Sequence, residues 1–272
     1  MFNLETKVGF VIVTVFIVTA IVEAIFGWSI LPYNPIHLDL SARYLTPSLT
    51  HFFGTSDLGE DVFSRVIAGS PNDAMVSFFV VGLAFITGGL LGSLAGLRGG
   101  WVDEVLMRVT DIFFAIPSLI LAMAIAVILG TSPVNLMIAL SLIWWPPYAR
   151  LARSEALRLS NAHFVESAKL SGLSIQRIVL RHIFPIAATT LMIYGTLDVG
   201  TLILTYSGLA YLGFAVRPPL PDWGADVANY QQAIATHPWL PLIPATIIVI
   251  VAVGFSLLGD GLRGALRHEQ GR

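Results

Sequence analysis

Residues 75–97 read MVSFFVVGLAFITGGLLGSLAGL and contain no charged side chain. An apolar run of about 20 residues is long enough to cross the hydrocarbon core of a bilayer as a helix. Within this run, Gly88, Gly92 and Gly96 recur at every fourth residue and therefore lie on one helix face. Such a strip lets a neighbouring helix approach closely, whereas the alternative interpretation is that the glycines only make the helix flexible. The stretch predicts a transmembrane helix with one closely packed face.

The composition of the whole chain agrees with a membrane location. Its 272 residues are 56% hydrophobic and 12% charged, whereas soluble chains are about 25% charged. The net charge of −2 argues against a nucleic-acid partner, because phosphate binding needs a concentrated basic surface. The chain has no cysteine, which excludes disulfides, thiolate nucleophiles and cysteine-ligated metals. These features indicate an integral membrane protein that binds no nucleic acid.

Five further apolar runs extend this prediction along the chain. The first resembles the apolar part of a signal peptide, but no small-x-small cleavage site follows it, so a retained helix is expected. Pro117 interrupts the third run, and Pro146 and Pro147 mark the end of the fourth. The fifth contains Asp198 and several glycines, so its helix is expected to be tilted or broken. The six expected spans cover residues 8–26, 75–97, 112–130, 134–148, 186–214 and 239–258. The predicted fold class is all-α, with six transmembrane helices.

The distribution of basic residues predicts the orientation. Six spans place both termini on the same side of the membrane, and cytoplasmic loops carry an excess of Lys and Arg. With the N-terminus inside, only Arg43, Arg65 and Arg217 of the 15 Lys and Arg residues fall outside. We therefore expect a multi-pass protein of the cell membrane, plasma or inner, with both termini in the cytoplasm.

Two segments outside the bilayer stand out by their length. Residues 28–73 form the external one, and residues 150–185 form an internal one that is too long for a simple connector. The chain shows no internal repeat and no Pro-, Gly- or Ser-rich linker, so one domain is expected. Within it, residues 1–74 hold the first transmembrane helix and the external loop, and residues 75–272 hold a five-helix core with the cytoplasmic loop.

The internal segment is expected to contain two helices. Residues 150–170 lack proline and glycine and predict a single helix, which Gly172 closes in a left-handed conformation. Ser174 is a plausible N-cap for a second, short helix that ends before Pro185. Two helices bent at a glycine form a rigid projection that can dock into another protein. The alternative is a solvated amphipathic hairpin without a partner.

The residues carry no recognisable energy-coupling or catalytic constellation. A phosphate-binding P-loop needs glycine directly before lysine, but Lys7 follows Thr6 and Lys169 follows Ala168. The six histidines all lie outside the expected spans, and none has HExxH spacing. The chain is therefore not expected to be an enzyme, to bind ATP itself or to hold a catalytic metal.

Ionisable groups inside the spans are the mark of an ion-coupled carrier or a channel. Glu23 lies near a helix end, where its side chain can reach the membrane interface. Asp198 lies well inside a span and is a candidate pathway residue. It is the main support for the alternative that this chain is a self-sufficient carrier or channel.

Residues 166–172 read ESAKLSG, and Pro185 follows thirteen residues after Gly172. This segment resembles the EAA loop of ABC-importer permeases, whose motif reads E-A-A, three residues, G, nine residues, I-x-L-P. The chain departs from the motif at Ser167, His182 and Phe184. His182, within the sequence RHIFP of residues 181–185, resembles the peptide branch of the family, where R-H-I-L-P is familiar.

Four other blocks extend the resemblance over nearly the whole chain. Residues 54–65 read GTSDLGEDVFSR, similar to the G-T-D-x-x-G-R-D-x-x-S-R signature of dipeptide, oligopeptide and nickel permeases, with Glu60 in place of the usual arginine. Residues 70–73 read SPND where the family has A-R-x-S. The remaining blocks are Gly99-Gly100-Trp101-Val102-Asp103 with Met107-Arg108 and Asp111, Tyr211-Leu212-Gly213-Phe214 with Pro218-Pro219 and Trp223-Gly224, and Gly259-Asp260-Gly261-Leu262-Arg263. The chain looks like the second, C-type permease subunit.

The resemblance implies a type I-like permease fold with a cytoplasmic coupling helix between the fourth and fifth spans. It implies as partners a second permease subunit, two cytoplasmic ATPases and an external substrate-binding protein. ATP and magnesium would then bind to the ATPases, and this chain would hold no cofactor. The ATPase-coupling loop would use Glu166, Ser167, Ala168, Gly172 and Pro185. Di- and oligopeptides are the first expectation for the substrate, and nickel or metallophore complexes and oligosaccharides are the alternatives.

Overall fold

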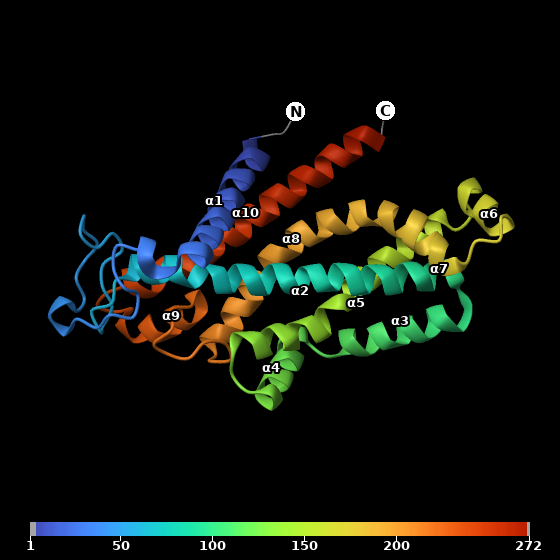
Figure 1. Ribbon diagram of the computed structural model, residues 1–272. Coiled ribbons are helices and arrows are strands. Elements are labelled where there is room, and N and C mark those ends of the chain that lie inside the picture. Colours follow the sequence, from blue (N-terminus) through green and yellow to red (C-terminus); the bar gives the residue numbers. More distant parts are fainter. Residues whose placement is uncertain (1–3, 271–272) are drawn as a thin grey trace. The chain divides into compact units, whose positions relative to one another are not determined.

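The computed structural model describes residues 4–270, with side chains as far as Ala265 (Figure 1). This part of the chain is helical and contains no β-strand, which confirms the all-α prediction. The two ends that were expected in the cytoplasm, residues 1–3 and 271–272, lie outside the described residues. The helices are α1 (Leu4–Phe26), α2 (Val62–Arg98), α3 (Gly100–Ala115), α4 (Ser118–Leu129), α5 (Pro133–Leu159), α6 (His163–Leu170), α7 (Ile175–Ile178), α8 (Phe184–Tyr211), α9 (Trp223–Tyr230) and α10 (Trp239–Gln270). Short 3₁₀ turns η1 (Gly27–Ile30), η2 (Leu40–Ala42) and η4 (Gln231–Ala233) and a π-helical turn η3 (Val179–Ile183) complete the order.

Among the described residues, four helical stretches are long and apolar enough to cross a membrane. They are Leu4–Ile30, Val62–Arg98, Ile175–Tyr211 and Trp239–Ala265. These stretches correspond to the first, second, fifth and sixth expected spans. The chain is therefore a multi-pass membrane protein, while the count of six spans remains a prediction.

The third expected span is sharply bent. Helices α3 and α4 together have the apolar length of a span, but their axes differ by 88°. The break falls at Ile116, whose φ of −110° and ψ of 129° are extended. Pro117 is the physical cause, because its ring disfavours the helical region for the preceding residue and its nitrogen donates no hydrogen bond. The segment is a broken span or a re-entrant loop.

The expectation that Pro146 and Pro147 end a helix is wrong. Both lie inside α5, which continues to Leu159. Pro71 likewise lies inside α2. A proline removes one backbone hydrogen bond and costs about 3 kcal/mol in an isolated helix, so tertiary packing must hold α5 together through its two prolines.

The glycine strip of α2 supplies that packing. A Cβ atom on Gly88 would overlap the carbonyl oxygen of Trp145, and one on Gly92 would overlap that of Ala149. A Cβ on Gly96 would lie 2.7 Å from the carbonyl oxygen of Arg153. The contacted residues of α5 also recur at every fourth position, so the two helices touch backbone to backbone over successive turns. The predicted close approach of a neighbouring helix is confirmed.

The chain forms two compact units that interleave along the sequence. Unit 1 comprises residues 1–78, 126–136 and 197–272, and unit 2 comprises residues 79–125 and 137–196. The boundary expected near residue 74 remains a prediction. Each unit is described below by itself.

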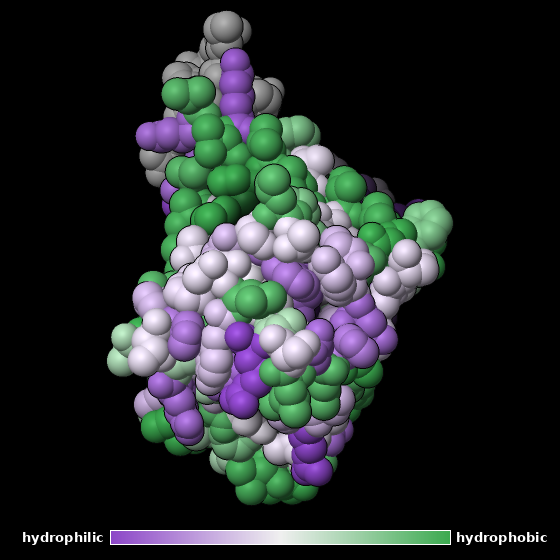
Figure 2. Space-filling model, turned by 90° about the vertical axis from the view of Figure 1, so that its left-hand side faces the viewer, coloured by the Kyte–Doolittle hydropathy of each residue, from purple (hydrophilic) through white to green (hydrophobic). Residues whose placement is uncertain are grey.

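In unit 1, α1 lies along α10 (Figure 1). Gly9 permits this contact, because a Cβ there would lie 2.8 Å from the carbonyl oxygen of Gly254. The outer face of α1 exposes large apolar side chains such as Phe10 and Ile25. Figure 2 shows hydrophobic side chains gathered in the upper part of the view, above a surface of mixed polar and apolar side chains. An apolar face exposed on a helix of spanning length is suited to contact with lipid.

Candidate functional site

The internal segment folds differently from its prediction between residues 150 and 170. The prediction of a single helix over residues 150–170 is wrong, because α5 ends at Leu159 and α6 begins at His163. Ser160 turns the chain, with its hydroxyl donating to the carbonyl oxygen of Leu157 at 2.8 Å. Serine side chains compete with backbone groups for such bonds and so favour turns over helix interiors. The segment therefore presents a separate eight-residue helix, α6.

Gly172 closes α6 as predicted. Its φ of +77° is left-handed, a conformation that costs residues with a Cβ about 1–2 kcal/mol. The amide of Gly172 donates to the carbonyl oxygen of Lys169 at 3.0 Å, and the amide of Leu173 donates to that of Ala168 at 3.1 Å. This pair of bonds is a Schellman motif, which satisfies carbonyls that the helix end leaves free. Ser174 occupies the N-cap position of α7, although its side chain makes no capping bond.

One face of α6 anchors the helix to unit 2. Val165 and Ala168 are buried in a hydrophobic cluster, whereas Glu166, Ser167 and Leu170 are exposed. The other buried members of the cluster are Leu97, Ala156, Leu159, Ile178, Val179 and Ile183. Leu170 is 90% exposed, which is unusual for a large apolar side chain at the end of a helix. The structure thus holds the inner face of α6 firmly and leaves an outer face with an apolar tip.

Glu166 lies on the outer face of α6, in its first turn. Its nearest ionic neighbour is the exposed His163, with Nδ1 4.0 Å from Oε2. An acid in the first turn complements the helix dipole, but the N-cap residue Ala162 offers no side-chain cap. The carboxylate is therefore free to meet another surface, and its proposed role in docking remains a prediction.

Pro185 does not end a helix, so the expected end before it is wrong. The chain runs as one helical stretch from α7 through η3 into α8, where Pro185 is the second residue. The amide of Phe184 bonds the carbonyl oxygen of Val179, five residues earlier, which widens the turn just ahead of the proline. A π-type turn relieves the clash of a proline ring with the carbonyl four residues before it.

Two ion-pair contacts near this segment were missed by the sequence reasoning. Arg153 of α5 binds both carboxylate oxygens of Asp103, with Nη2 2.6 Å from Oδ2. One turn away, Arg150 binds Asp111 at 2.5 Å and lies 4.1 Å from the centre of the Phe114 ring. These pairs fix α3 to α5. The signal in the sequence was that both acids lie in residues 99–111, one of the blocks that carry the family resemblance.

Asp198 lies on α8 in unit 1 and is 8% exposed. It interacts with neighbouring groups, so it is not an isolated intramembrane charge. The coupling-loop residues belong to unit 2. The possible pathway role of Asp198 remains a prediction.

The external block of residues 54–65 forms a tight turn followed by the start of α2. Gly54 and Gly59 have positive φ values, and a Cβ on either would overlap a carbonyl oxygen of the external segment. Asp61 precedes α2, and its Oδ2 accepts from the amide of Ser64 at 2.8 Å and from its hydroxyl at 2.7 Å. Its Oδ1 pairs with Nδ1 of His51 at 2.9 Å. Gly54, Gly59 and Asp61 thus have local structural roles in the turn.

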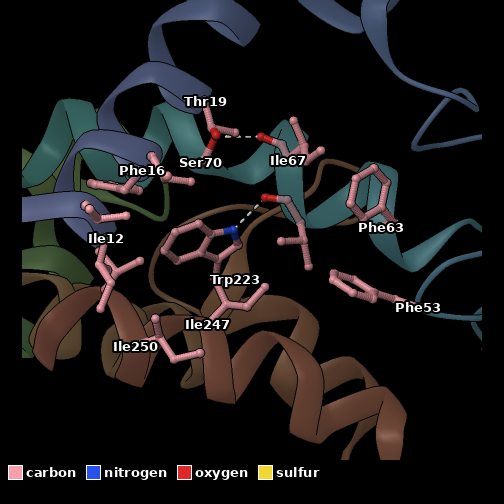
Figure 3. A pocket seen from close by; sticks show the side chains of 14 residues that line it. Ile12, Phe16, Thr19, Phe53, Phe63, Ile67, Ser70, Trp223, Ile247 and Ile250 are labelled. Carbon is pink, nitrogen blue, oxygen red and sulfur yellow. Dashed lines mark hydrogen bonds between the residues drawn. The ribbon is translucent and has the colours of Figure 1, made fainter. Parts of the chain in front are cut away.

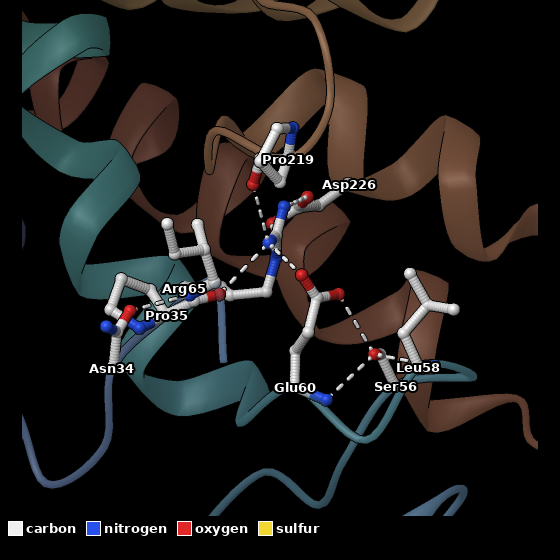
Figure 4. Close-up of polar contacts among 9 residues, drawn as sticks. Asn34, Pro35, Ser56, Leu58, Glu60, Arg65, Pro219 and Asp226 are labelled. Atoms are coloured by element: carbon white, nitrogen blue, oxygen red, sulfur yellow. Dashed lines mark hydrogen bonds and ion pairs between the residues drawn. The ribbon is translucent and has the colours of Figure 1, made fainter. Parts of the chain in front are cut away.

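Arg65, the last residue of that block, is the centre of a buried polar network (Figure 4). Its guanidinium donates two bonds to Asp226, at 3.1 and 2.6 Å, and one to Glu60 at 2.7 Å. It also donates to the carbonyl oxygens of Pro35 and Pro219, both at 3.1 Å. Nε and Nη2 bind Asp226, and Nη1 is shared by Glu60 and the two carbonyl oxygens, so each of the three guanidinium nitrogens has a partner. The network joins the external segment, α2 and α9.

Burial shifts the pKa values of the two acids in this network, Glu60 and Asp226. Burial raises the pKa of Glu60, while Arg65 and the hydroxyl of Ser56 oppose the shift. Burial also raises the pKa of Asp226 to about 6, against the attraction of Arg65. The contact with Arg65 gives Glu60, a departure from the signature that the block resembles, a structural role. Sequence reasoning missed Asp226, which lies 161 positions from Arg65.

An apolar cavity of about 490 Å³ lies in unit 1 between α1, α2, α9 and α10 (Figure 3). Phe16, Ile67 and Ile250 are among the side chains that line it. The indole of Trp223 lies at the wall, but its Nε1 donates to the carbonyl oxygen of Val66 at 2.7 Å. The cavity therefore offers little to a hydrophilic substrate. Among the described residues, no group of three or more His, Asp or Glu side chains could hold a metal ion.

Comparison with known proteins identifies the family. Residues 88–269 match the family described as binding-protein-dependent transport system inner membrane component. The chain is 38% identical over 257 residues to the probable D,D-dipeptide transport system permease protein DdpC of Escherichia coli, covering 94% of this chain and 86% of the relative. It is 39% identical over 260 residues to the dipeptide permease DppC of Alkalihalophilus pseudofirmus, covering 95% and 84%. It is 38% identical over 252 residues to the glutathione permease GsiD of Escherichia coli, covering 92% and 83%.

These matches run through both the internal loop and most of the external block, and they confirm the resemblance drawn from the motifs. The relatives are permease subunits rather than enzymes. The chain belongs to the family of binding-protein-dependent transport system inner membrane components.

Proposed function

We propose that this chain is one of two membrane-spanning subunits of an ATP-driven importer for di- or oligopeptides. The observation that carries the proposal is the identity of 38% to 39% over more than nine-tenths of the chain with permeases named for dipeptide, D,D-dipeptide and glutathione transport. The peptide-like histidine variant at His182 in the internal loop supports the same substrate class.

The proposed topology has six spans, with both termini in the cytoplasm. Four apolar helices, the bent pair α3–α4 and the apolar first half of α5 supply the six segments. The excess of basic residues on one side supports the orientation. In this arrangement residues 1–74 precede a five-helix core that begins at residue 75, and the whole is one domain.

The proposed coupling device is α6. Its inner face is held by Val165 and Ala168, so a force applied to the helix passes into α2, α5 and the start of α8 through the buried cluster. Its outer face offers Glu166, Ser167 and the apolar tip Leu170 to a partner. Gly172 and Pro185 shape the return to α8. A helix anchored on one side and exposed on the other is suited to transmit the closure of an ATPase dimer.

The remaining parts of the machine belong to other chains. A second permease completes the pathway, two cytoplasmic ATPases bind ATP and magnesium, and an external binding protein delivers the peptide. This chain binds no cofactor of its own.

The test is purification of the tagged chain in mild detergent, followed by uptake of a labelled dipeptide into proteoliposomes that hold the recovered complex. We expect the sister permease and ATPases to copurify, and uptake to require both ATP and the external binding protein. Dipeptide uptake by this chain alone, driven by an ion gradient and lost in Asp198→Asn, would contradict the proposal and favour a carrier.

A further inference from the structure

A second polar cluster lies in unit 1, where α2, α8 and the start of α9 meet. Gly69 of α2 lets the segment before α9 approach, because a Cβ there would lie 3.3 Å from the Cα of Asp222. Gly224 of α9 lies against the carbonyl oxygen of Ser207 on α8, which a Cβ would overlap. The two glycines therefore let the three elements pack closely, and Asp73, Ser207 and Asp222 at their junction are buried.

Asp73 of α2 is wholly buried at this junction. Its Oδ1 accepts a hydrogen bond from the hydroxyl of Ser207 at 3.3 Å. Its Oδ2 has no hydrogen-bond partner among the described residues. Ser77, one helical turn further along α2, is equally buried and its hydroxyl also lacks a partner there. An ionised carboxylate that is buried with an unpaired oxygen carries a large desolvation penalty.

A second carboxyl shares the junction. Asp222, also wholly buried, accepts from the hydroxyl of Tyr206 at 3.0 Å and from the amide of Ala225 at 3.1 Å. Tyr206 and Ser207 are neighbours on α8, so adjacent hydroxyls serve the two acids. The negative charges of Asp73 and Asp222 act on one another.

The positive charge nearest to this pair, the Arg65 guanidinium, forms its ion pairs with other acids. Arg65 of α2 attracts Asp222, but its guanidinium bonds go to Asp226 and Glu60. The other titratable groups around the junction are Asp226 of α9 and Tyr206 of α8, which supply no cation. Within the described part of the chain, neither Asp73 nor Asp222 forms an ion pair. Two buried like charges without a cation cannot both persist.

We propose that Asp73 and Asp222 form a proton-binding site, in which the pair holds one proton that keeps α9 packed against α2 and α8. The proton comes from bulk water and converts one carboxylate to a neutral carboxyl, whose new O–H donates within the cluster. This removes one of the two charges and supplies a donor where unpaired oxygens lie.

The direction of the pH dependence follows from burial. Burial raises the pKa of Asp222, despite bonds from the Ala225 amide and Tyr206 that act in the opposite direction. A group with a raised pKa binds its proton more tightly in the folded chain than in the unfolded one. Its contribution to stability is therefore present at acid pH and is lost as the pH rises. Packing of α9 should loosen on the alkaline side.

The test uses the purified full chain, with its sister subunit where this copurifies, and compares Asp73→Asn, Asp73→Ser and Asp222→Asn with the wild type. Infrared difference spectra between about pH 5 and about pH 9 detect the C=O stretch of a protonated carboxyl. We expect one such band to be lost in all three variants. We also expect the fall in melting temperature with rising pH to become shallower in Asp73→Asn. Asp73→Ser, a second replacement without a carboxyl group, guards against a folding defect specific to asparagine.

Asp260→Asn is the matched control, because its carboxylate is 69% exposed, and it should leave both readouts unchanged. Retention of every carboxyl band in the Asp73 variants, with an unaltered pH profile, would overturn the proposal. Stabilisation of the wild type by sodium over choline at equal ionic strength, absent from Asp73→Asn, would also overturn it, because the pair would then bind a metal cation. Both readouts are independent of transport, so they stand whatever substrate the importer proves to carry.

Discussion

At the scale of the single residue, Arg65 shows how one side chain can tie distant segments together. Its guanidinium is buried, and each of its three nitrogens donates to a carboxylate or carbonyl oxygen, with acceptors from four separate parts of unit 1. A buried charge is tolerated only when it is paired, and removing one partner leaves the others unpaired in a low-dielectric setting.

Arg65→Ala should therefore destabilise the permease by about 3–5 kcal/mol, because Asp226 and Glu60 would lose their shared cation. Arg65→Lys should recover only part of this loss, since an ammonium cannot reproduce the two-pronged contact with Asp226. Thermal unfolding in detergent measures both effects. Arg108→Ala is the control, because that side chain is 75% exposed. Equal melting temperatures for Arg65→Ala and Arg108→Ala would contradict the assignment.

Gly172 allows a second effect to be tested at a single residue, which is the strain that a left-handed backbone conformation imposes on residues with a Cβ. Apart from the glycine and its chain neighbours, no atom of the described residues lies within 4 Å of the position that a Cβ would take, so only the φ of +77° opposes a larger residue. Gly172→Val should abolish ATP-driven uptake while leaving membrane insertion intact, because a β-branched side chain resists positive φ. Gly172→Asn should keep uptake, since asparagine tolerates this conformation. Uptake by the valine variant at the wild-type rate would remove the bend from the mechanism.

At the scale of the element, the contact between α2 and α5 stabilises two helices that both contain proline. The Gly88, Gly92 and Gly96 strip brings backbones together, and α5 remains helical through two consecutive prolines beside it. Close packing of small residues drives helix association in membranes, where apolar burial alone contributes little.

Gly92→Leu should separate these helices and cost at least about 1–3 kcal/mol, because the side chain has no space at the Ala149 carbonyl. Gly82→Leu is a matched control on the same helix, since a Cβ there meets nothing within 4 Å. Melting temperatures of the two variants test the contrast. Similar losses in both would mean that the glycine strip acts through flexibility rather than packing.

At the scale of the whole molecule, the central question is how a machine divided among several chains is coupled. Helix α6 is the exposed element best suited to meet a cytoplasmic partner, because an anchored inner face opposes a projecting apolar tip. This prediction rests on the proposed function.

Leu170→Asp should lower the affinity for the ATPase subunits by about fivefold or more, the loss expected when an apolar anchor worth about 1 kcal/mol is removed. Copurification and ATP-driven uptake measure the change. Leu49→Asp on the external segment is the control, because Leu49 is equally exposed, at 92%. Glu166→Arg should weaken the same association without altering contact with the external binding protein. Normal recovery of the ATPases with both α6 variants would place the docking surface elsewhere.

Local patterns predicted what depends on local physics. The apolar runs identified four of the spanning helices, the four-residue glycine period identified the packed face of α2, and Gly172 identified the end of α6. Helix continuity was harder to predict. The prediction that helices end at Pro146, Pro147 and Pro185 was wrong, because packing and a π-type turn stabilise helices that local propensity disfavours. The same signal succeeded at Pro117, where the chain bends.

The sequence by itself determined that this chain is an all-helical membrane protein and, through its motifs, to which family it belongs. Hydrophobic length and backbone chirality act within one segment, so their traces can be read along the chain. Only the tertiary structure decided which charges meet. Arg65 finds Asp226 across 161 positions, and Asp73 meets the Ser207 hydroxyl across 134. Burying a charged group carries a desolvation penalty, and the partner that offsets this penalty is in place only after the segments have packed.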